Sequence, residues 1–148
     1  MSNEKNVKGY ENIISAKEIF QKHIDKLKED ILGIQYVIIS TEDGFPVATV
    51  NVDVQHAVGR AALTASLEGL CITVAAESKF TNFNSVHIEC ENGFVFSRNI
   101  ELADDCKIVL LTAVSSEENL ASVLWHIKEM SSKIQQEFKQ TSQSAVTK

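Results

Sequence analysis

The sequence predicts an α/β domain of the α+β type, in the order helix, two strands, helix, three strands, helix. Helical periodicity recurs in three long segments, which is typical of amphipathic helices packed on a core. Two short apolar runs show no alternation, which indicates strands covered on both faces. Two Asx-Gly pairs separate strand-like runs and indicate hairpins. The expected fold is a five-stranded antiparallel sheet with helices on both faces.

Length and composition exclude several classes of protein. A chain of 148 residues favours one domain and buries a sizeable core without a disulfide or a metal. The net charge of −6 argues against a nucleic-acid surface, which needs a dense basic patch. The scattered cysteines Cys71, Cys90 and Cys106 form no CxxC pair, which favours reduced thiols in a cytoplasmic protein.

The two ends of the chain are polar. We expect a flexible N-terminus at residues 1–12, a single domain at residues 13–139 and a disordered tail at residues 140–148. The polar start is unlike a signal peptide. No apolar run looks long enough to cross a bilayer, so no membrane insertion is expected.

The first helix is expected to begin at Ser15, which forms a capping box with Glu18. Apolar residues then recur on one helical face at Phe20, Ile24 and Leu27. Gly33 is placed to end the helix.

The first two strands form a hairpin. Residues 36–39 are apolar in succession, so this strand is expected at the centre of the sheet. Asp43-Gly44 predicts a two-residue turn with positive φ at both positions. Pro46 has no N–H to give to a neighbouring strand, which places the second strand at a sheet edge.

The second helix, capped by Asp53, carries two rows of side chains. The expected core face is formed by Leu63, Leu67, Leu70 and Val74. The other row consists of small residues at helical spacing: Gly59, Ala62, Ser66, Gly69, Thr73 and Ala76. A small row lets another backbone approach closely. That backbone is either the sheet of the same molecule or the same helix of a second copy, and the sequence leaves both open.

The last three strands begin with an alternating run at residues 86–91 and a turn at Asn92-Gly93. A two-residue turn there places Glu89 opposite Phe96 and His87 opposite Arg98. Residues 107–114 form the most apolar strand, which must be central. The last helix follows, with an apolar face that carries Leu120, Leu124, Ile127, Ile134 and Phe138.

The two doubly buried strands are expected to be neighbours, which leaves residues 86–91 at the far edge of the sheet. An open edge strand invites pairing with another chain. We therefore expect a homodimer that joins through this edge and through the small row of the second helix. The candidate self-interface residues are Gly59, Ala62, Ser66, Gly69, Thr73, Ala76, Val86, His87, Ile88, Glu89, Cys90 and Glu91.

Five segments carry a resemblance to a known family: residues 36–39, 43–48, 61–70, 86–95 and 107–111. In order and spacing they resemble the roadblock family, which includes dynein light-chain roadblock and bacterial MglB-like proteins. The resemblance covers residues 15–138. It implies a homodimer or heterodimer with a sheet continuous across both subunits and the second helices packed together. It also implies a regulator or scaffold of small Ras-like GTPases, which in some members accelerates GTP hydrolysis by reshaping the site of the GTPase itself.

Catalytic and cofactor chemistry is not expected. All six glycines are isolated, so neither a GxGxxG nor a Walker loop is present and no nucleotide cofactor is expected. The four histidines show no metal-ligand spacing, and no catalytic residue set stands out, so the chain is not expected to be an enzyme.

Arg60 is a candidate contact to the partner, because an arginine supplied to a GTPase stabilises charge in the transition state. An arginine early in a helix more often reaches solvent or a carboxylate. The alternative function is a small-molecule sensor with a pocket between sheet and helix, which needs a sizeable apolar cavity with a few polar groups.

Overall fold

The computed structural model describes residues 2–103 and 105–146; Met1, Asp104 and residues 147–148 lie outside the described residues. Its elements are α1 (Ser2–Ser15), α2 (Lys17–Asp30), β1 (Ile34–Thr41), β2 (Pro46–Val50), α3 (Val54–Glu77), β3 (Ser85–Cys90), β4 (Gly93–Ala103), β5 (Cys106–Ser115) and α4 (Leu120–Val146). The strands form one antiparallel sheet in the order β2-β1-β5-β4-β3. The predicted fold class is confirmed, and so is the order of the strands.

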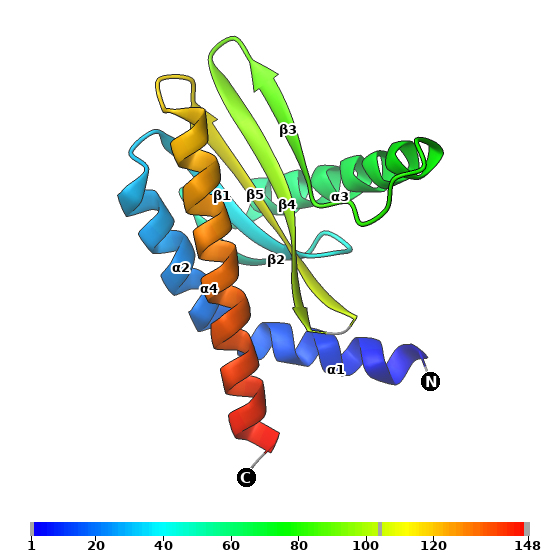
Figure 1. The fold of residues 1–148 in the computed structure, drawn as a ribbon. Coiled ribbons are helices and arrows are strands. Elements are labelled where there is room, and N and C mark those ends of the chain that lie inside the picture. Colours follow the sequence, from blue (N-terminus) through cyan, green and yellow to red (C-terminus); the bar gives the residue numbers. More distant parts are fainter. Residues whose placement is uncertain (1, 104, 147–148) are drawn as a thin grey trace.

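The two faces of the sheet are covered unequally. In Figure 1, α2 and α4 lie side by side across one face, and α3 crosses the other. The main core lies under α2 and α4, where Phe20, Ile24, Ile127 and Ile134 pack on the sheet. Among the described residues, the second hydrophobic cluster lies under α3 and is small, with Ile38, Ala57 and Leu111 as its buried members. One face of the sheet is therefore well packed and the other only partly covered.

Helical structure extends further at both ends than the sequence predicts. Residues 2–12, expected to be flexible, belong to α1, and residues 140–146, expected in a disordered tail, belong to α4. The expected helix start at Ser15 is wrong, since the Ser15 hydroxyl donates to the Glu11 carbonyl inside α1. The chain bends at Ala16, which is buried with Ile13. A polar helix with few apolar anchors has too little periodicity to be recognised. The single domain at 13–139 stays a prediction.

The hairpin between β1 and β2 differs from the expected two-residue turn. The Thr41 N–H donates to the Phe45 carbonyl at 2.9 Å, and the Gly44 N–H donates to the Thr41 carbonyl at 3.1 Å. Gly44 alone in this loop has a positive φ, of 94°. The loop is therefore a three-residue connection with glycine in the left-handed region. A Cβ on Gly44 would lie 3.2 Å from the backbone of Ala61 in α3, so this turn packs tightly under the helix.

The hairpin between β3 and β4 is shifted by two residues from the predicted register. Cys90 pairs with Gly93, which places His87 opposite Phe96 and Glu89 opposite Phe94. Gly93 is a strand residue rather than a turn residue. A Cβ there would lie 2.7 Å from the Val114 carbonyl oxygen, so glycine is needed because β5 passes close by. The Asn92-Gly93 pair correctly predicts a hairpin between β3 and β4, but it does not predict which residues form the turn.

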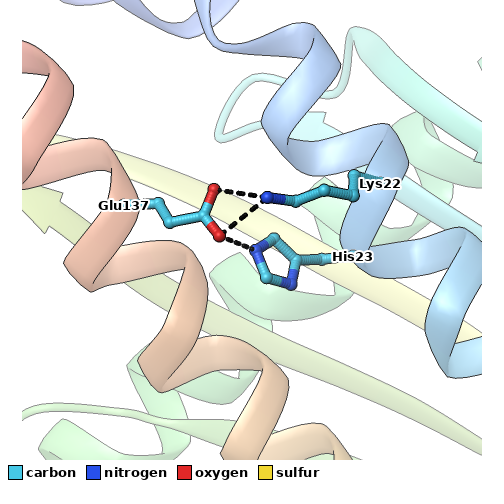
Figure 2. Close-up of polar contacts among 3 residues, drawn as sticks. All are labelled: Lys22, His23 and Glu137. Atoms are coloured by element: carbon cyan, nitrogen blue, oxygen red, sulfur yellow. Dashed lines mark hydrogen bonds and ion pairs between the residues drawn. The ribbon is translucent and has the colours of Figure 1, made fainter.

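An ionic cluster links α2 to α4 (Figure 2). The Lys22 ammonium donates to both oxygens of the Glu137 carboxylate at 2.8 Å, and His23 Nε2 lies 3.0 Å from Glu137 Oε1. Burial lowers the pKa of His23 by more than the hydrogen bond to Glu137 raises it. Hydrogen bonding to Lys22 is the largest cause that lowers the pKa of Glu137. The folded chain therefore favours neutral His23 beside ionised Glu137.

Stability is expected to fall as the pH drops below about 6.5, the ordinary pKa of histidine. The unfolded chain then takes up a proton at His23 that the folded chain resists, so the free energy of unfolding decreases. Urea titrations between pH 7.5 and 5.5 measure this slope. The variant His23→Gln should flatten it, whereas the control Lys22→Gln keeps the imidazole and should retain most of it. Equal slopes in the wild type and His23→Gln would contradict this account.

Candidate self-association surface

Helix α3 touches the rest of the molecule along a narrow row of residues. Asp53 caps it, as expected, by accepting the His56 N–H at 2.9 Å. The buried residues are Ala57, Ala61, Thr64 and Glu68, at spacings of four, three and four. All four lie in the first 15 of the 24 residues of the helix. The second half of α3 therefore has little cover from its own chain.

The row expected to be the core face of α3 is instead exposed. Leu63, Leu70 and Val74 are 73%, 67% and 65% exposed, and Leu67 is half-buried. The expectation is wrong because alanines, rather than leucines, take the contact with the sheet and the β1–β2 turn. Small side chains let the helix lie close to that turn. The leucine row is then rotated to the side of the helix, where it borders the uncovered part of the sheet.

The small row of α3 also lies in the open. Gly59, Ala62, Ser66, Gly69, Thr73 and Ala76 are all exposed. A Cβ on Gly59 or Gly69 would meet nothing within 4 Å. The small row therefore does not pack on the sheet of its own molecule, which is one of the two alternatives that the sequence leaves open. Its contact with a second copy stays a prediction.

An apolar groove of about 170 Å³ runs between the leucine row and the sheet. It is lined by Tyr36, Arg60, Leu63, Thr64, Leu67, Val86, Ile88, Val95, Ser97 and Leu111. Figure 1 shows that the second half of α3 extends beyond β3, past the edge of the sheet. The groove, the leucine row and β3 together form one continuous surface, which we call the open face.

In the part of the chain that the structure describes, strand β3 lies at the edge of the sheet and has β4 as its one neighbour. Val86 is half-buried, and residues 87–91 are exposed. Just before the strand, the Asn99 N–H donates to the Asn84 carbonyl at 2.9 Å. Hydrogen-bonded and non-bonded residues alternate in an antiparallel pair, so the even-numbered residues bond to β4. The N–H and C=O groups of Ser85, His87 and Glu89 therefore point away from the sheet.

A buried carboxylate holds α3 to β4. The Ser97 hydroxyl donates to Glu68 Oε1 at 2.7 Å. With its amide nitrogen turned toward Glu68, Asn99 donates to Oε2 at 2.7 Å. Burial raises the pKa of Glu68, and the nearby charge of Glu42 adds to this effect. This polar cluster fixes the position of the helix over the sheet at the end of its buried row.

Arg60 lies at the groove rather than free in solvent. Its guanidinium carbon is 4.2 Å from the centroid of the Tyr36 ring, a cation–π contact. An arginine that enters the site of a GTPase must extend freely, so this contact disfavours that role. Contact of Arg60 with a partner stays a prediction.

Other chemistry in the described part of the chain is sparse. Within residues 2–103 and 105–146, no three His, Cys, Asp or Glu side chains lie close enough to hold a metal ion. Cys71, Cys90 and Cys106 are free thiols.

By length and composition α3 could cross a bilayer, since a stretch of 18 residues within it has a mean hydropathy of 1.3, which corrects the expectation that no segment is long enough. The same length and composition are found in membrane spans and in apolar helices that pack on protein. The buried hydrogen bonds of Glu68 to β4 favour the second reading for the folded chain.

Comparison of the sequence with protein-family profiles and with curated proteins gives no match. Solved structures share the fold. A Roadblock/LC7 domain from Streptomyces avermitilis aligns with a TM-score of 0.72 at 13% identity, over 80% of this chain and 97% of that domain. Myxococcus xanthus MglB aligns with a TM-score of 0.69 at 18% identity, over 81% and 87%. A structure described as MglB with tetrameric arrangement aligns with a TM-score of 0.67 at 15% identity, over 79% and 88%. The chain therefore has the roadblock fold.

The variant Glu68→Gln is expected to be at least as stable as the wild type at pH 7. The fold favours the protonated carboxyl, so ionised Glu68 costs stability at neutral pH, and this cost disappears as the pH falls below the ordinary pKa of about 4.5. Thermal unfolding at pH 7 and pH 4 measures the difference, which should shrink at pH 4. Glu68→Ala should instead lose about 1–3 kcal/mol, because it leaves Ser97 and Asn99 without a partner. A Glu68→Gln variant as unstable as Glu68→Ala would contradict this account.

Proposed function

We propose that the chain is a homodimeric interaction module that regulates or recruits a small Ras-like GTPase and has no catalytic residues of its own. The observation that carries the proposal is the open face, which joins an unpaired strand edge to an apolar groove and an exposed leucine row. Contiguous apolar surface beside an open edge is typical of a protein interface.

A second copy of the chain fits this surface. When two β3 edges pair antiparallel, the two sheets become continuous and their α3 faces lie on the same side. The second half of α3, which extends beyond β3, then lies over the sheet of the other subunit. Leu70 and Val74 would enter the groove of that subunit. Burial of each such side chain contributes about 1.5–3 kcal/mol, and both subunits contribute the same set.

The fold supports self-association and a partner of the GTPase class. One structural neighbour is described as MglB in a tetrameric arrangement. The roadblock family, which the sequence resembles, regulates or scaffolds small Ras-like GTPases. The free thiols are consistent with a cytoplasmic site of action.

The chemistry of the open face favours regulation through the conformation of the GTPase over regulation through a catalytic group donated by this chain. The open face presents leucines, valines and Ile88, and its arginine is stacked on Tyr36. We therefore propose that the dimer changes the conformation of the GTPase or localises it. The sensor alternative is weaker, because the groove of about 170 Å³ is smaller than the roughly 300–1,000 Å³ of ligand pockets.

The variant Leu70→Glu is expected to be a folded monomer. In the proposed dimer, this substitution places a carboxylate in the apolar groove of the other subunit, which costs more than the dimer gains from that contact. Sedimentation equilibrium at micromolar concentration should give the mass of two chains for the wild type and of one chain for Leu70→Glu. Circular dichroism should show the same helical content in both.

The matched control is Leu32→Glu, which changes a leucine that is 90% exposed in the connection between α2 and β1. This site lies outside the open face, so the variant should remain dimeric. Dissociation of Leu32→Glu, or a Leu70→Glu variant with the mass of two chains, would contradict the proposed surface.

The GTPase assignment is tested with the immobilised chain as bait in a lysate of its own cell. We expect recovery of a nucleotide-binding protein whose retention differs between GTP and GDP loading. Single-turnover GTP hydrolysis by that purified protein should change on addition of the wild-type dimer, but less on addition of Leu70→Glu. If the chain regulates by tethering alone, the rate is unchanged but retention still depends on the nucleotide. Absence of any nucleotide-dependent partner would contradict the proposal.

A further inference from the structure

We infer that the two copies join with Ile88 of each on the twofold axis, so that His87 of one copy faces Glu89 of the other. This inference rests on the proposed homodimer and specifies how its two edges meet. It depends on three properties of β3: the direction of its free backbone groups, the face of each side chain and the order of charges along the strand.

Symmetry restricts how two copies of β3 can pair. Antiparallel pairing of identical edges requires a twofold axis perpendicular to the sheet, which keeps the α3 face of both copies on the same side. Residues directly opposite each other in an antiparallel pair also share a face. Because side chains alternate between faces, a residue can then oppose only residues an even number of positions away. The twofold axis therefore lies midway between one residue of β3 and the same residue of the other copy. It cannot lie level with the peptide bond between two successive residues.

The side chains of β3 divide clearly between the two faces. His87 lies on the face of α2 and α4, where its ring contacts Phe96 edge-on with centroids 4.9 Å apart. Glu89, two residues on, shares that face. Val86 and Ile88 line the groove under α3 on the other face. The edge thus presents a polar row on one side of the sheet and an apolar row on the other.

Charge distinguishes the three central residues of β3, His87, Ile88 and Glu89, as candidates for the position of the axis. An axis through Glu89 places two carboxylates directly opposite each other, which is destabilising. An axis through His87 places two imidazoles opposite each other and leaves Glu89 facing Ser85. An axis through Ile88 places each His87 opposite a Glu89, twice per dimer. An imidazole N–H donates to a carboxylate in either protonation state of the ring, so this register gives two favourable pairs.

The backbone and the apolar face fit the same register. The free N–H and C=O groups of His87 and Glu89 point outward, so these two residues form a hydrogen-bonded pair across the axis. On the groove side, Ile88 meets its own copy and Val86 meets Cys90. Ile88 then forms a non-hydrogen-bonded pair, in which Cα atoms are about 4.5 Å apart, the closest approach in a sheet.

Symmetric cysteine cross-linking locates the axis directly. In a Cys90→Ser background, one of the variants His87→Cys, Ile88→Cys or Glu89→Cys is oxidised with copper-phenanthroline, and the dimer is followed on a non-reducing gel. A disulfide needs Cα atoms about 4.4–6.8 Å apart, which only the residue on the axis reaches with its own copy. Ile88→Cys should cross-link at least tenfold faster than the other two, and the Cys90→Ser parent should not cross-link.

The outcomes separate this register from the dimer itself. Fastest cross-linking at 87 or 89 would overturn the Ile88 axis but keep the β3 edge as the interface. No cross-linking at any position, with a parent that sediments as two chains, would show that the copies meet elsewhere and would also overturn the inference. A parent that sediments as one chain would overturn both the register and the proposed function.

Discussion

The close contact of α3 with the sheet through small side chains determines which apolar surfaces the rest of the molecule leaves open. Ala57 and Ala61 let the helix lie near the β1–β2 turn, where Gly44 leaves room for its backbone. Glu68 then holds the helix to β4 through Ser97 and Asn99. Because the side of the helix that carries Ala57 and Ala61 packs on the sheet, the leucine row lies beside the sheet and not on it. The chain thus keeps on its surface an apolar set that in other folds would form the core.

The unequal cover of the sheet follows from the same arrangement. On one face, α2 and α4 bury a continuous core and are joined by the cluster of Lys22, His23 and Glu137. On the other face, α3 contacts β1 and β2, borders the groove beside β3, and extends past the edge of the sheet (Figure 1). An edge strand is normally protected by charge, by a bulge or by a covering element. Here the edge presents His87 and the Glu89 carboxylate on the same face, two residues apart, and these are the groups that the proposed pairing with a second copy brings together.

Prediction from sequence succeeded where one physical signal dominated. The non-alternating apolar runs correctly predict that β1 and β5 lie at the centre of the sheet. Pro46 correctly predicts that β2 lies at an edge, because proline has no N–H to donate to a second neighbouring strand. The hairpin registers could not be predicted, since Gly93 serves a close approach of β5 that only the tertiary structure creates. The face of α3 was missed for a similar reason: Leu63 and Leu70 look like core residues, and only the packed sheet shows that Ala57 and Ala61 take that place. Helix α1 was missed because most of its residues are polar and its few apolar residues lie toward its end.

The central claim is that a second copy covers the edge and the groove that one copy leaves open. Amide hydrogen exchange of β3, measured over a range of chain concentrations, tests it most directly. The account predicts that the N–H groups of His87 and Glu89 exchange rapidly in dilute solution and become protected as the concentration rises, while the amides of β1 stay protected throughout. Rapid exchange of both N–H groups at every concentration would contradict it.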